Sequence, residues 1–270
     1  MIRLEDHRRI IRAELHRDGQ PDGRLQLANH YVIRLEGVSL SFDRPVLHNV
    51  SLCARSGETL MIAGESGSGK STILKLILRL LLPDQGTIKV FDNNVVDLTF
   101  EQALDLRRHI GMVFQSAALF DSLSIFENVA YPLRENKNLD EPEMERVVRE
   151  RLDFVDLDAD EVMGKLPSQL SGGMRKRVGI ARAIATDPEV ILFDEPTAGL
   201  DPLTAGTINF LVKKLQRELG VTSIVVTHDM RAGFRVANRA CLLREGQIVF
   251  EGSPEEMVAA DDQYIQAFLS

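Results

Sequence analysis

The chain has 270 residues, of which 44% are apolar and 27% are charged, so it can bury the core of one large domain or of a domain with a subdomain. Its formal net charge of -8 makes it a poor candidate for a protein that coats nucleic acid. Its two cysteines, Cys53 and Cys241, lie far apart in sequence and match no metal-ligand spacing, which favours two reduced thiols in a cytoplasmic protein.

The N-terminal region lacks the features of a secretory signal. Its first twenty residues mix arginine with acidic residues and contain no uncharged core. The most apolar run of the chain, residues 73–83, is short and is interrupted by Lys75 and Arg79. We expect residues 1–30 to be an N-terminal extension and any membrane span to come from another chain.

The apolar patterns alternate between strands and helices along the chain. Strands are predicted over 31–42, 46–54, 58–64, 86–92, 110–115, 190–195 and 223–228, and as a pair within 240–252. Helices are predicted from the glycine loop to Leu82, within the charged region 116–165, after Ser171 and over 204–219. This order favours a doubly wound α/β fold with a parallel sheet and a helical insertion.

A phosphate-binding loop lies between the strand ending at Gly64 and the helix that follows. The sequence GESGSGKST fits the pattern G-x-x-x-x-G-K-[ST] in the strand–loop–helix context that the pattern requires. Its small residues let the backbone wrap phosphates, Lys70 reaches the β- and γ-phosphates, and the Ser71 hydroxyl ligates Mg²⁺. The predicted nucleotide-binding residues of the loop are Gly64, Glu65, Ser66, Gly67, Ser68, Gly69, Lys70, Ser71 and Thr72.

Two acids end the apolar strand in VILFDEP. The carboxyl ends of parallel strands meet at one sheet edge, so Asp194 and Glu195 are expected beside the nucleotide. There Asp194 would orient the Mg²⁺ shell and Glu195 would polarise the attacking water. His228 follows the strand SIVVT and reaches the same edge, where it could contact the γ-phosphate. Structural acids and a surface histidine are the simpler alternatives.

A second glycine-rich turn opens a helix at SQLSGGMRKRVGIARA, which starts at Ser168. Such a helix start presents backbone N–H groups and a positive dipole end, and both suit an anion. The chain therefore has two phosphate-reading helix starts about a hundred residues apart.

The ordered motifs GESGSGKST, Gln115, LSGGM, VILFDEP, AGLD and His228 resemble the nucleotide-binding subunits of ATP-binding cassette (ABC) transporters over about residues 31–260. The resemblance implies a P-loop NTPase with a RecA-like parallel-sheet core, an antiparallel β subdomain, an α-helical signature subdomain at about 116–175 and a C-terminal tail at 261–270. It also implies that two copies pair head to tail. The signature residues Ser171, Gly172 and Gly173 would then bind the γ-phosphate of the ATP on the partner's P-loop.

Further roles follow from the same resemblance. Phe42 would stack on adenine, Gln115 would contact Mg²⁺ and signal to a membrane subunit, and Asp201 would lie across the dimer seam. Met174 departs from the family, because most members have glutamine there. Backbone contacts of the signature should survive this change.

A narrower resemblance lies in residues 114–135 and in LPSQLSGGM, which are similar to the ATPases of Mce-associated phospholipid-trafficking systems, the Mla group. It implies an ATPase that uses ATP and Mg²⁺ and lies peripherally on the cytoplasmic face of a bacterial inner membrane. There it would energise phospholipid movement between the inner and outer membranes, which maintains outer-membrane lipid asymmetry. The implied partners are a multispan permease, a periplasmic Mce-domain protein and a small cytoplasmic accessory subunit, with no nucleic acid.

Two other classes of function are open. A soluble cassette protein acting on DNA or ribosomes is disfavoured by the single cassette, by the acidic charge and by the short interval between Lys70 and Ser171. A transporter ATPase for another solute would differ only in the narrower motif.

The segment after Gln115 is rich in apolar residues for a region that leaves the core: Leu119, Phe120, Leu123, Ile125, Phe126 and Tyr131. Core packing of the helical subdomain is one explanation. An exposed remainder would be a protein-binding patch. We therefore predict that a cytoplasmic helix of the permease docks between the core and the helical subdomain and touches residues 117–133.

Overall fold

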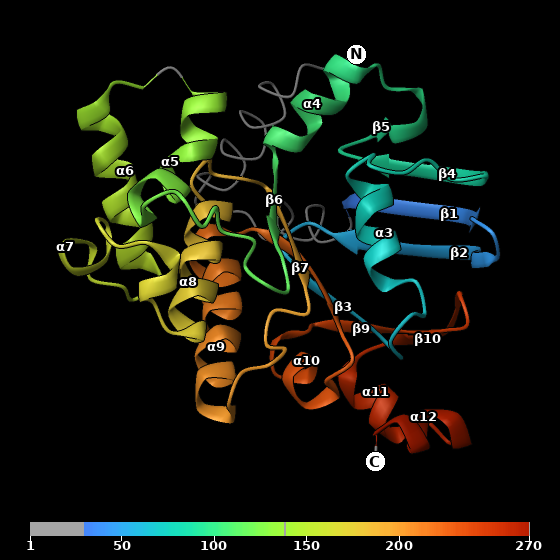
Figure 1. The fold of residues 1–270 in the computed structure, drawn as a ribbon. Helices are drawn as coiled ribbons and strands as arrows, with labels where there is room; N and C mark the ends of the chain where they lie inside the picture. The colour runs from blue at the N-terminus through green and yellow to red at the C-terminus, as the bar shows by residue number, and fades with distance from the viewer. Residues whose placement is uncertain (1–29, 138, 270) are drawn as a thin grey trace, which may run out of the picture.

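The structure is a computed structural model that describes residues 30–137 and 139–269 (Figure 1). The predicted N-terminal extension lies outside the described residues except for His30. The strands are β1 (Tyr31–Ser41), β2 (Pro45–Arg55), β3 (Thr59–Gly64), β4 (Gln85–Val90), β5 (Asn93–Asn94), β6 (Ile110–Val113), β7 (Val190–Asp194), β8 (Thr222–Thr227), β9 (Arg239–Arg244) and β10 (Gln247–Gly252). The helices are α3 (Lys70–Ile77), α4 (Phe100–Arg108), α5 (Ile125–Asn136), α6 (Glu141–Phe154), α7 (Ala159–Val162), α8 (Gly172–Ala183), α9 (Pro202–Leu219), α10 (Met230–Val236), α11 (Pro254–Ala259) and α12 (Gln263–Leu269), with short 3₁₀ turns at Val95–Asp97 and Pro167–Gln169.

The strands form two sheets. The larger has the order β10-β9-β3-β8-β7-β6, and all of its pairs are parallel except the antiparallel pair of β10 with β9. The smaller is antiparallel, with the order β2-β1-β4-β5. The predicted parallel core and antiparallel subdomain are both confirmed.

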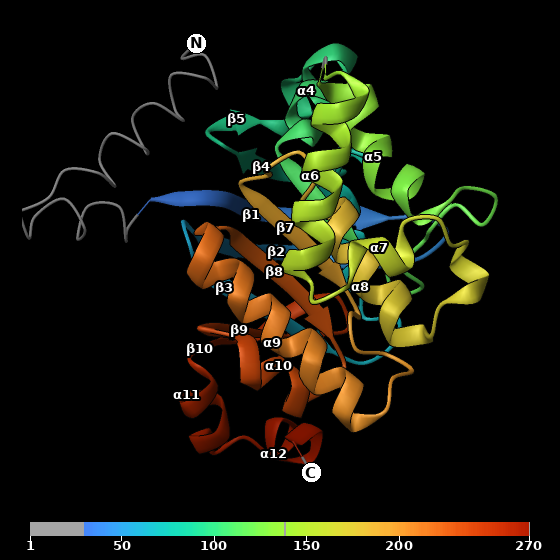
Figure 2. The same cartoon turned by 90° about the vertical axis from the view of Figure 1, so that its left-hand side faces the viewer.

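The larger sheet is covered on both faces, as its continuous apolar strands require. Successive residues of β3 show this, because their side chains alternate between faces. Leu60 and Ile62 pack with α3 and the small sheet, whereas Met61 and Ala63 pack with α10, α11 and α12. Figure 2 shows α9 lying across the sheet, with α11 and α12 at the end of the molecule farthest from α4.

The helices of the insertion pack together and against the large sheet. Helices α5, α6 and α8 share one apolar cluster with α9 and with Ile191 and Phe193 of the large sheet. In Figure 1 these helices lie to one side of the strands, and the small sheet lies on the other. No described helix is long and apolar enough to cross a bilayer.

The first core helix is shorter than the sequence predicts. It ends at Ile77 rather than Leu82, because the chain turns at Arg79, whose φ is +52°. Arg107 of α4 donates hydrogen bonds to the carbonyl oxygens of Leu78 and Arg79, which lie just beyond the end of the helix. Helix α4 was not predicted from the sequence, although Thr99 begins it with a capping box.

The predicted C-terminal tail contains a helix. Within α12, Ile265 is 4% exposed and joins Met61 and Met230 in the third apolar cluster. The boundary at residue 260 stays a prediction, but the described residues beyond it pack on the core.

Candidate active site

The P-loop lies between β3 and α3 and is wedged against β2. Gly69 is the residue before α3 and has φ +106°, a conformation that favours glycine. A Cβ atom at Gly69 would lie 2.7 Å from Leu47 Cδ2 and 3.2 Å from the Val46 carbonyl oxygen. A side chain at this position would therefore push the loop away from the small sheet.

Lys70 is the cation of the loop. Its ammonium donates to the carbonyl oxygens of Gly64 and Glu65, both at 2.8 Å, and lies 4.0 Å from Glu195 Oε1. Burial lowers the pKa of Lys70, and the carboxylates of Glu195, Asp194 and Glu65 oppose that shift. The charge is thus held inside the turn that would receive phosphates.

The other loop residues add polar groups to the same turn. Ser68 is 8% exposed, and its hydroxyl oxygen has no hydrogen-bond partner among the described residues. A buried hydroxyl usually has a partner, and a phosphate oxygen would supply one. Ser66, Gly67 and Thr72 lie in the same strand–loop–helix segment.

Ser71 and Asp194 meet across the site. The Ser71 hydroxyl donates to Asp194 Oδ1 at 2.9 Å, which joins the start of α3 to the end of β7. Gln115 follows β6, where Val113 pairs with Phe193, so Gln115 is level with Glu195 on the neighbouring strand. Oxygen donors of this kind suit Mg²⁺, which keeps several waters and phosphate ligands. The residues present therefore fit a magnesium ion held chiefly by Ser71, Gln115 and a nucleotide.

Glu195 and His228, which the sequence predicts to be catalytic, lie in contact with each other. His228 Nδ1 lies 2.9 Å from Glu195 Oε1, and the His228 backbone N–H donates to Glu195 Oε2 at 3.3 Å. The Glu195 carboxyl group is largely buried, whereas the His228 side chain is 61% exposed. The carboxylate is fixed by the histidine and remains next to the P-loop lysine.

The signature segment begins α8 with a serine cap. Ser171 Oγ accepts a hydrogen bond from the Met174 backbone N–H at 3.2 Å, and Ser171 and Gly172 are exposed. A Cβ atom on Gly173 would lie 2.4 Å from Thr204 Cγ2, so glycine is needed there for packing against α9. The Met174 side chain packs against the apolar cluster of the helical subdomain, where an apolar residue fits.

Asp201 caps the next helix. It accepts hydrogen bonds from the backbone N–H groups of Leu203 and Thr204 at 3.1 Å and from the Thr204 hydroxyl at 2.5 Å. These hydrogen bonds lower the pKa of Asp201, and the bond from the Thr204 hydroxyl has the largest effect. Asp201 thus fixes the start of α9 beside Gly173.

Phe42 lies in the turn between β1 and β2 and is 59% exposed. The nearby residues Val46 and Leu47 approach Gly69, so this turn lies on the P-loop side of the small sheet. An exposed ring there suits stacking on a base. Among the described residues, Phe42, Gln115, Ser171 and Asp201 make no hydrogen bond or ion pair to the group formed by the P-loop, Asp194, Glu195 and His228.

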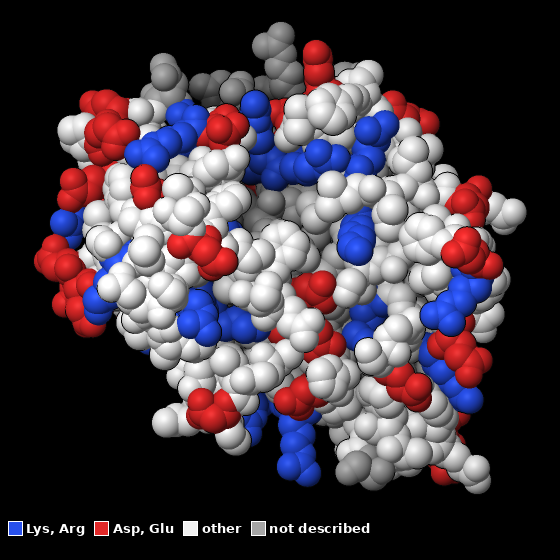
Figure 3. Space-filling view, viewed as in Figure 1, with Lys and Arg blue, Asp and Glu red and all other residues white. Residues whose placement is uncertain are grey.

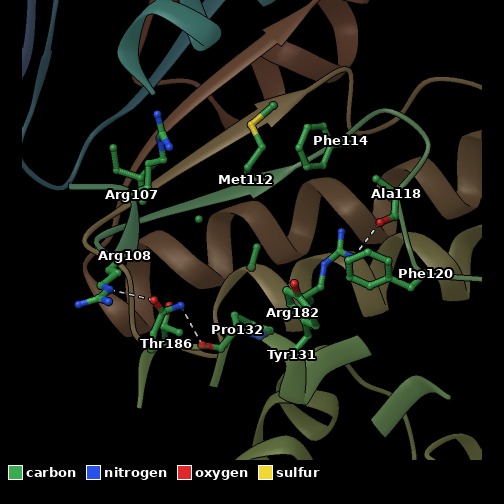
Figure 4. A pocket seen from close by; sticks show the side chains of 14 residues that line it. Arg107, Arg108, Met112, Phe114, Ala118, Phe120, Tyr131, Pro132, Arg182 and Thr186 are labelled. Atoms are coloured by element: carbon green, nitrogen blue, oxygen red, sulfur yellow. Dashed lines mark hydrogen bonds between the residues drawn. The ribbon is translucent and has the colours of Figure 1, made fainter. Parts of the chain in front are cut away.

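A groove of about 310 Å³ separates the core from the helical subdomain. Its lining comes from α4, β6, the loop after β6, α5 and the end of α8: Arg107, Arg108, Ile110, Gly111, Met112, Phe114, Ala118, Phe120, Tyr131, Pro132, Asn136, Arg182, Ala183 and Thr186 (Figure 4). Figure 3 shows the molecule hollowed on this face, with basic side chains along one rim.

The predicted apolar segment divides between this groove and the core. Phe120 and Tyr131 are 43% and 44% exposed, and their rings lie 4.9 Å apart in the groove. Ile125 is fully buried, and Phe126 and Leu119 pack against the helical cluster. Core packing therefore accounts for the buried residues of the segment, and a protein-binding patch at the exposed rings stays a prediction.

Arg182 is a groove residue that sequence reasoning missed. Its guanidinium donates to the carbonyl oxygens of Ala117 and Ala118 at 2.8 and 2.7 Å, and burial lowers its pKa. Both alanines have positive φ, which the sequence does not reveal. Arg182 thus ties the end of the signature helix to the loop that follows Gln115.

Tyr264 was also missed. Its hydroxyl donates to Glu65 Oε1 of the P-loop at 3.1 Å, and the Arg244 guanidinium lies 4.0 Å from its ring centroid. The two residues lie 199 positions apart in the sequence, and no sequence signal joins them. The C-terminal helix therefore contacts a loop residue that the sequence predicts to bind nucleotide.

The model of the family described as ABC transporter matches residues 47–198. The chain is 39% identical over 227 residues to the intermembrane phospholipid transport system ATP-binding protein MlaF of Haemophilus influenzae, which covers 84% of this chain and 85% of that protein. It is 34% identical over 250 residues to the "Probable ribonucleotide transport ATP-binding protein mkl" of Mycobacterium leprae, covering 92% of this chain and 71% of that protein.

A solved structure gives the same fold. The dimeric post-hydrolysis state of the ATP-binding cassette MJ0796, bound to ADP and Pi, has a TM-score of 0.76 and 35% identity, and covers 82% of this chain and 98% of that chain. This similar cassette was solved with ADP and Pi, the products of ATP hydrolysis. The similarity places this protein in the class of ATPases. The chain belongs to the family of ABC transporters, and its ATP hydrolysis is coupled to transport.

Proposed function

We propose that this chain energises a bacterial inner-membrane transporter that moves phospholipid between the inner and outer membranes and so maintains outer-membrane lipid asymmetry. The observation that carries the proposal is the 39% identity to a phospholipid transport ATPase over most of both chains. The chain would then lie peripherally on the cytoplasmic face of the inner membrane.

The active-site geometry supports a defined division of labour. Lys70 would offset the charge of the β- and γ-phosphates, and Ser71 and Gln115 would hold Mg²⁺, with Asp194 beside Ser71 to orient its ligands. Magnesium, when bound, neutralises charge on the phosphates. Glu195 would accept a hydrogen bond from the attacking water. His228, which is exposed to solvent, would hold the Glu195 carboxylate in place.

The signature supports a shared nucleotide site. Ser171 and Gly172 are exposed at the start of α8, where the helix dipole and free N–H groups favour an anion. The similar cassette MJ0796 was solved as a dimer. In the proposed head-to-tail dimer, the Ser171–Gly173 segment binds the γ-phosphate of the partner's ATP and Asp201 lies at the seam.

The groove supports a membrane partner. Phe114, Phe120 and Tyr131 offer aromatic contacts, and Arg107 and Arg108 supply positive charge at its edge. A cytoplasmic helix of a multispan permease with apolar and acidic side chains would fit this lining. A periplasmic Mce-domain protein and a small accessory subunit complete the proposed complex.

Ribonucleotide transport is the second candidate cargo, because the Mycobacterium leprae relative carries that description at 34% identity. Isolation of the native complex from cells that express a tagged chain separates the two. We expect a multispan permease and enriched phospholipid, and Lys70→Ala serves as the control that assembles without turnover. Recovery of the permease with nucleotide cargo and no phospholipid would favour the second candidate.

A further inference from the structure

The signature helix carries a lysine on its buried face. Lys176 is 6% exposed, and it shares the helical stripe of Gly179, Ile180 and Ala183, which are all buried. A lysine is rarely buried without a partner, since removing its charge from water is costly. The buried ammonium of Lys176 therefore needs a polar contact.

The Lys176 ammonium contacts the backbone of Glu195, the proposed catalytic residue. Lys176 Nζ donates to the carbonyl oxygen of Glu195 at 3.4 Å. No described carboxylate forms an ion pair with it, although Glu195 and Asp194 attract it electrostatically. Burial is the larger influence and lowers the pKa of Lys176. The lysine thus acts here through a hydrogen bond rather than a salt bridge.

That carbonyl belongs to a backbone in an unfavourable conformation. Glu195 has φ +48°, which a residue with a Cβ adopts only when its surroundings fix it. Its N–H donates to the Val226 carbonyl oxygen at 3.0 Å, and its own carbonyl oxygen accepts from the Ala198 N–H at 3.1 Å. The hydrogen bond from Lys176 adds a contact between this peptide group and the helical subdomain.

We propose that Lys176 is a positioning residue that holds the Glu195 backbone in its left-handed conformation and links it to the signature helix of the same chain. This inference rests on the proposed role of Glu195. Ser171, at the start of the same helix, would read the partner's ATP, and Lys176 lies little more than one helical turn further on. Each subunit would thereby connect the ATP of its partner with the carboxylate that acts on its own ATP.

The test compares Lys176→Met, Lys176→Arg and Lys214→Met in the full chain. Methionine keeps the length of the side chain but cannot donate, whereas arginine restores a cationic donor. Lys214 is the control, because it also donates to a backbone carbonyl, that of Phe154 at 2.8 Å, although it also pairs with Asp156 at 3.5 Å.

We expect Lys176→Met to lower kcat on the order of tenfold to a hundredfold, because a displaced catalytic group has effects of this size. KM for ATP and Tm should stay near those of Lys214→Met, and Lys176→Arg should recover part of kcat. Wild-type kcat in Lys176→Met, or a parallel loss of kcat and Tm with no rescue by arginine, would overturn the inference. Normal turnover in Glu195→Gln would instead overturn the proposed role of Glu195.

Discussion

At the scale of single residues, Glu195 is constrained from several sides. Its backbone is fixed by Val226 and Lys176, and its carboxylate faces His228 Nδ1 at 2.9 Å and the Lys70 ammonium at 4.0 Å. A general base must be held in a defined orientation to act on a bound water. The contacts to Val226, Lys176 and His228 provide that orientation.

Glu195→Gln should therefore separate binding from chemistry. The amide keeps the shape of the side chain but cannot accept a proton, so turnover should fall by about 10²–10⁴-fold. ATP affinity should persist, because Lys70 and Ser71 are unchanged, and an ATP-bound closed dimer should accumulate. Steady-state ATPase rates and nucleotide titrations check this. Turnover near the wild-type rate would remove Glu195 from the catalytic role.

The residues that the sequence could predict are those whose chemistry depends on a local pattern. The strand–loop–helix context of Lys70 and the strand-end position of Asp194 both follow from short segments, and the structure brings them together through Ser71. Lys176 did carry a signal, because it lies at helical spacing on an apolar stripe. Its target could not be predicted, since that depends on a tertiary contact with Glu195.

At the scale of elements, strands were easier to predict than the ends of helices. Continuous apolar runs gave β3, β7 and β8 to within a residue or two, because a strand covered on both faces must be apolar throughout. The predicted end of α3 was wrong. The helix stops earlier because Arg79 adopts a left-handed conformation and the distant Arg107 donates to the carbonyl oxygen of Leu78. Neither cause lies in the local pattern.

The loop and helix after Gln115 show a similar limit. Its apolar residues alternate between the core and the groove, and only packing shows that Ile125 faces inward while Phe120 and Tyr131 remain exposed. The segment follows a strand that pairs with β7, the strand that ends at Asp194, so in the proposed function it would link the nucleotide site to the groove.

Charged substitutions in the groove should uncouple the chain from its membrane partner. In Phe120→Asp the new carboxylate would lie near Arg182, whose guanidinium is 5.9 Å from the ring centroid, so the fold should tolerate it. Tyr131→Asp removes the other ring. Loss of an aromatic anchor should lower recovery of the permease on the order of tenfold or more. ATP binding by the isolated chain should be unchanged.

Val258→Asp is the matched control for these groove variants. Val258 is 55% exposed on α11, outside the groove, so its substitution should leave permease recovery intact. Permease co-purification and an outer-membrane barrier assay report the two effects. Equal recovery in all three variants would mean that the exposed rings are ordinary surface and that the phospholipid proposal loses its structural support.

At the scale of the whole molecule, the two helix starts that the sequence predicts to bind phosphate lie in different surroundings. The start of α3 belongs to the P-loop of this chain, whereas the start of α8 is exposed and makes no described contact with that loop. In the proposed head-to-tail dimer, the start of α8 would face the ATP of the partner, so both helix starts would bind phosphate. This arrangement can be tested with two inactive variants that complement each other.

Lys70→Ala should lose nucleotide binding or hydrolysis, because it removes the cation that offsets the phosphate charge. Ser171→Arg should still bind ATP on its own P-loop but fail to close on the partner. Because Ser171 is exposed, the arginine can extend into solvent, and the lost helix cap should cost only about 1 kcal/mol of stability. Ser253→Arg is the control, since Ser253 caps α11 through the Glu256 N–H at 3.1 Å.

Mixing the two inactive variants should restore activity. A dimer of one Lys70→Ala subunit and one Ser171→Arg subunit has one site in which an intact P-loop faces an intact signature. Random pairing makes half of the dimers mixed, each with one of its two sites complete, so ATPase activity should reach about a quarter of the wild-type value. Ser253→Arg alone should stay near wild type. If the mixture is no more active than its separate components, each chain hydrolyses ATP without the partner's signature, and the exposed start of α8 needs another explanation.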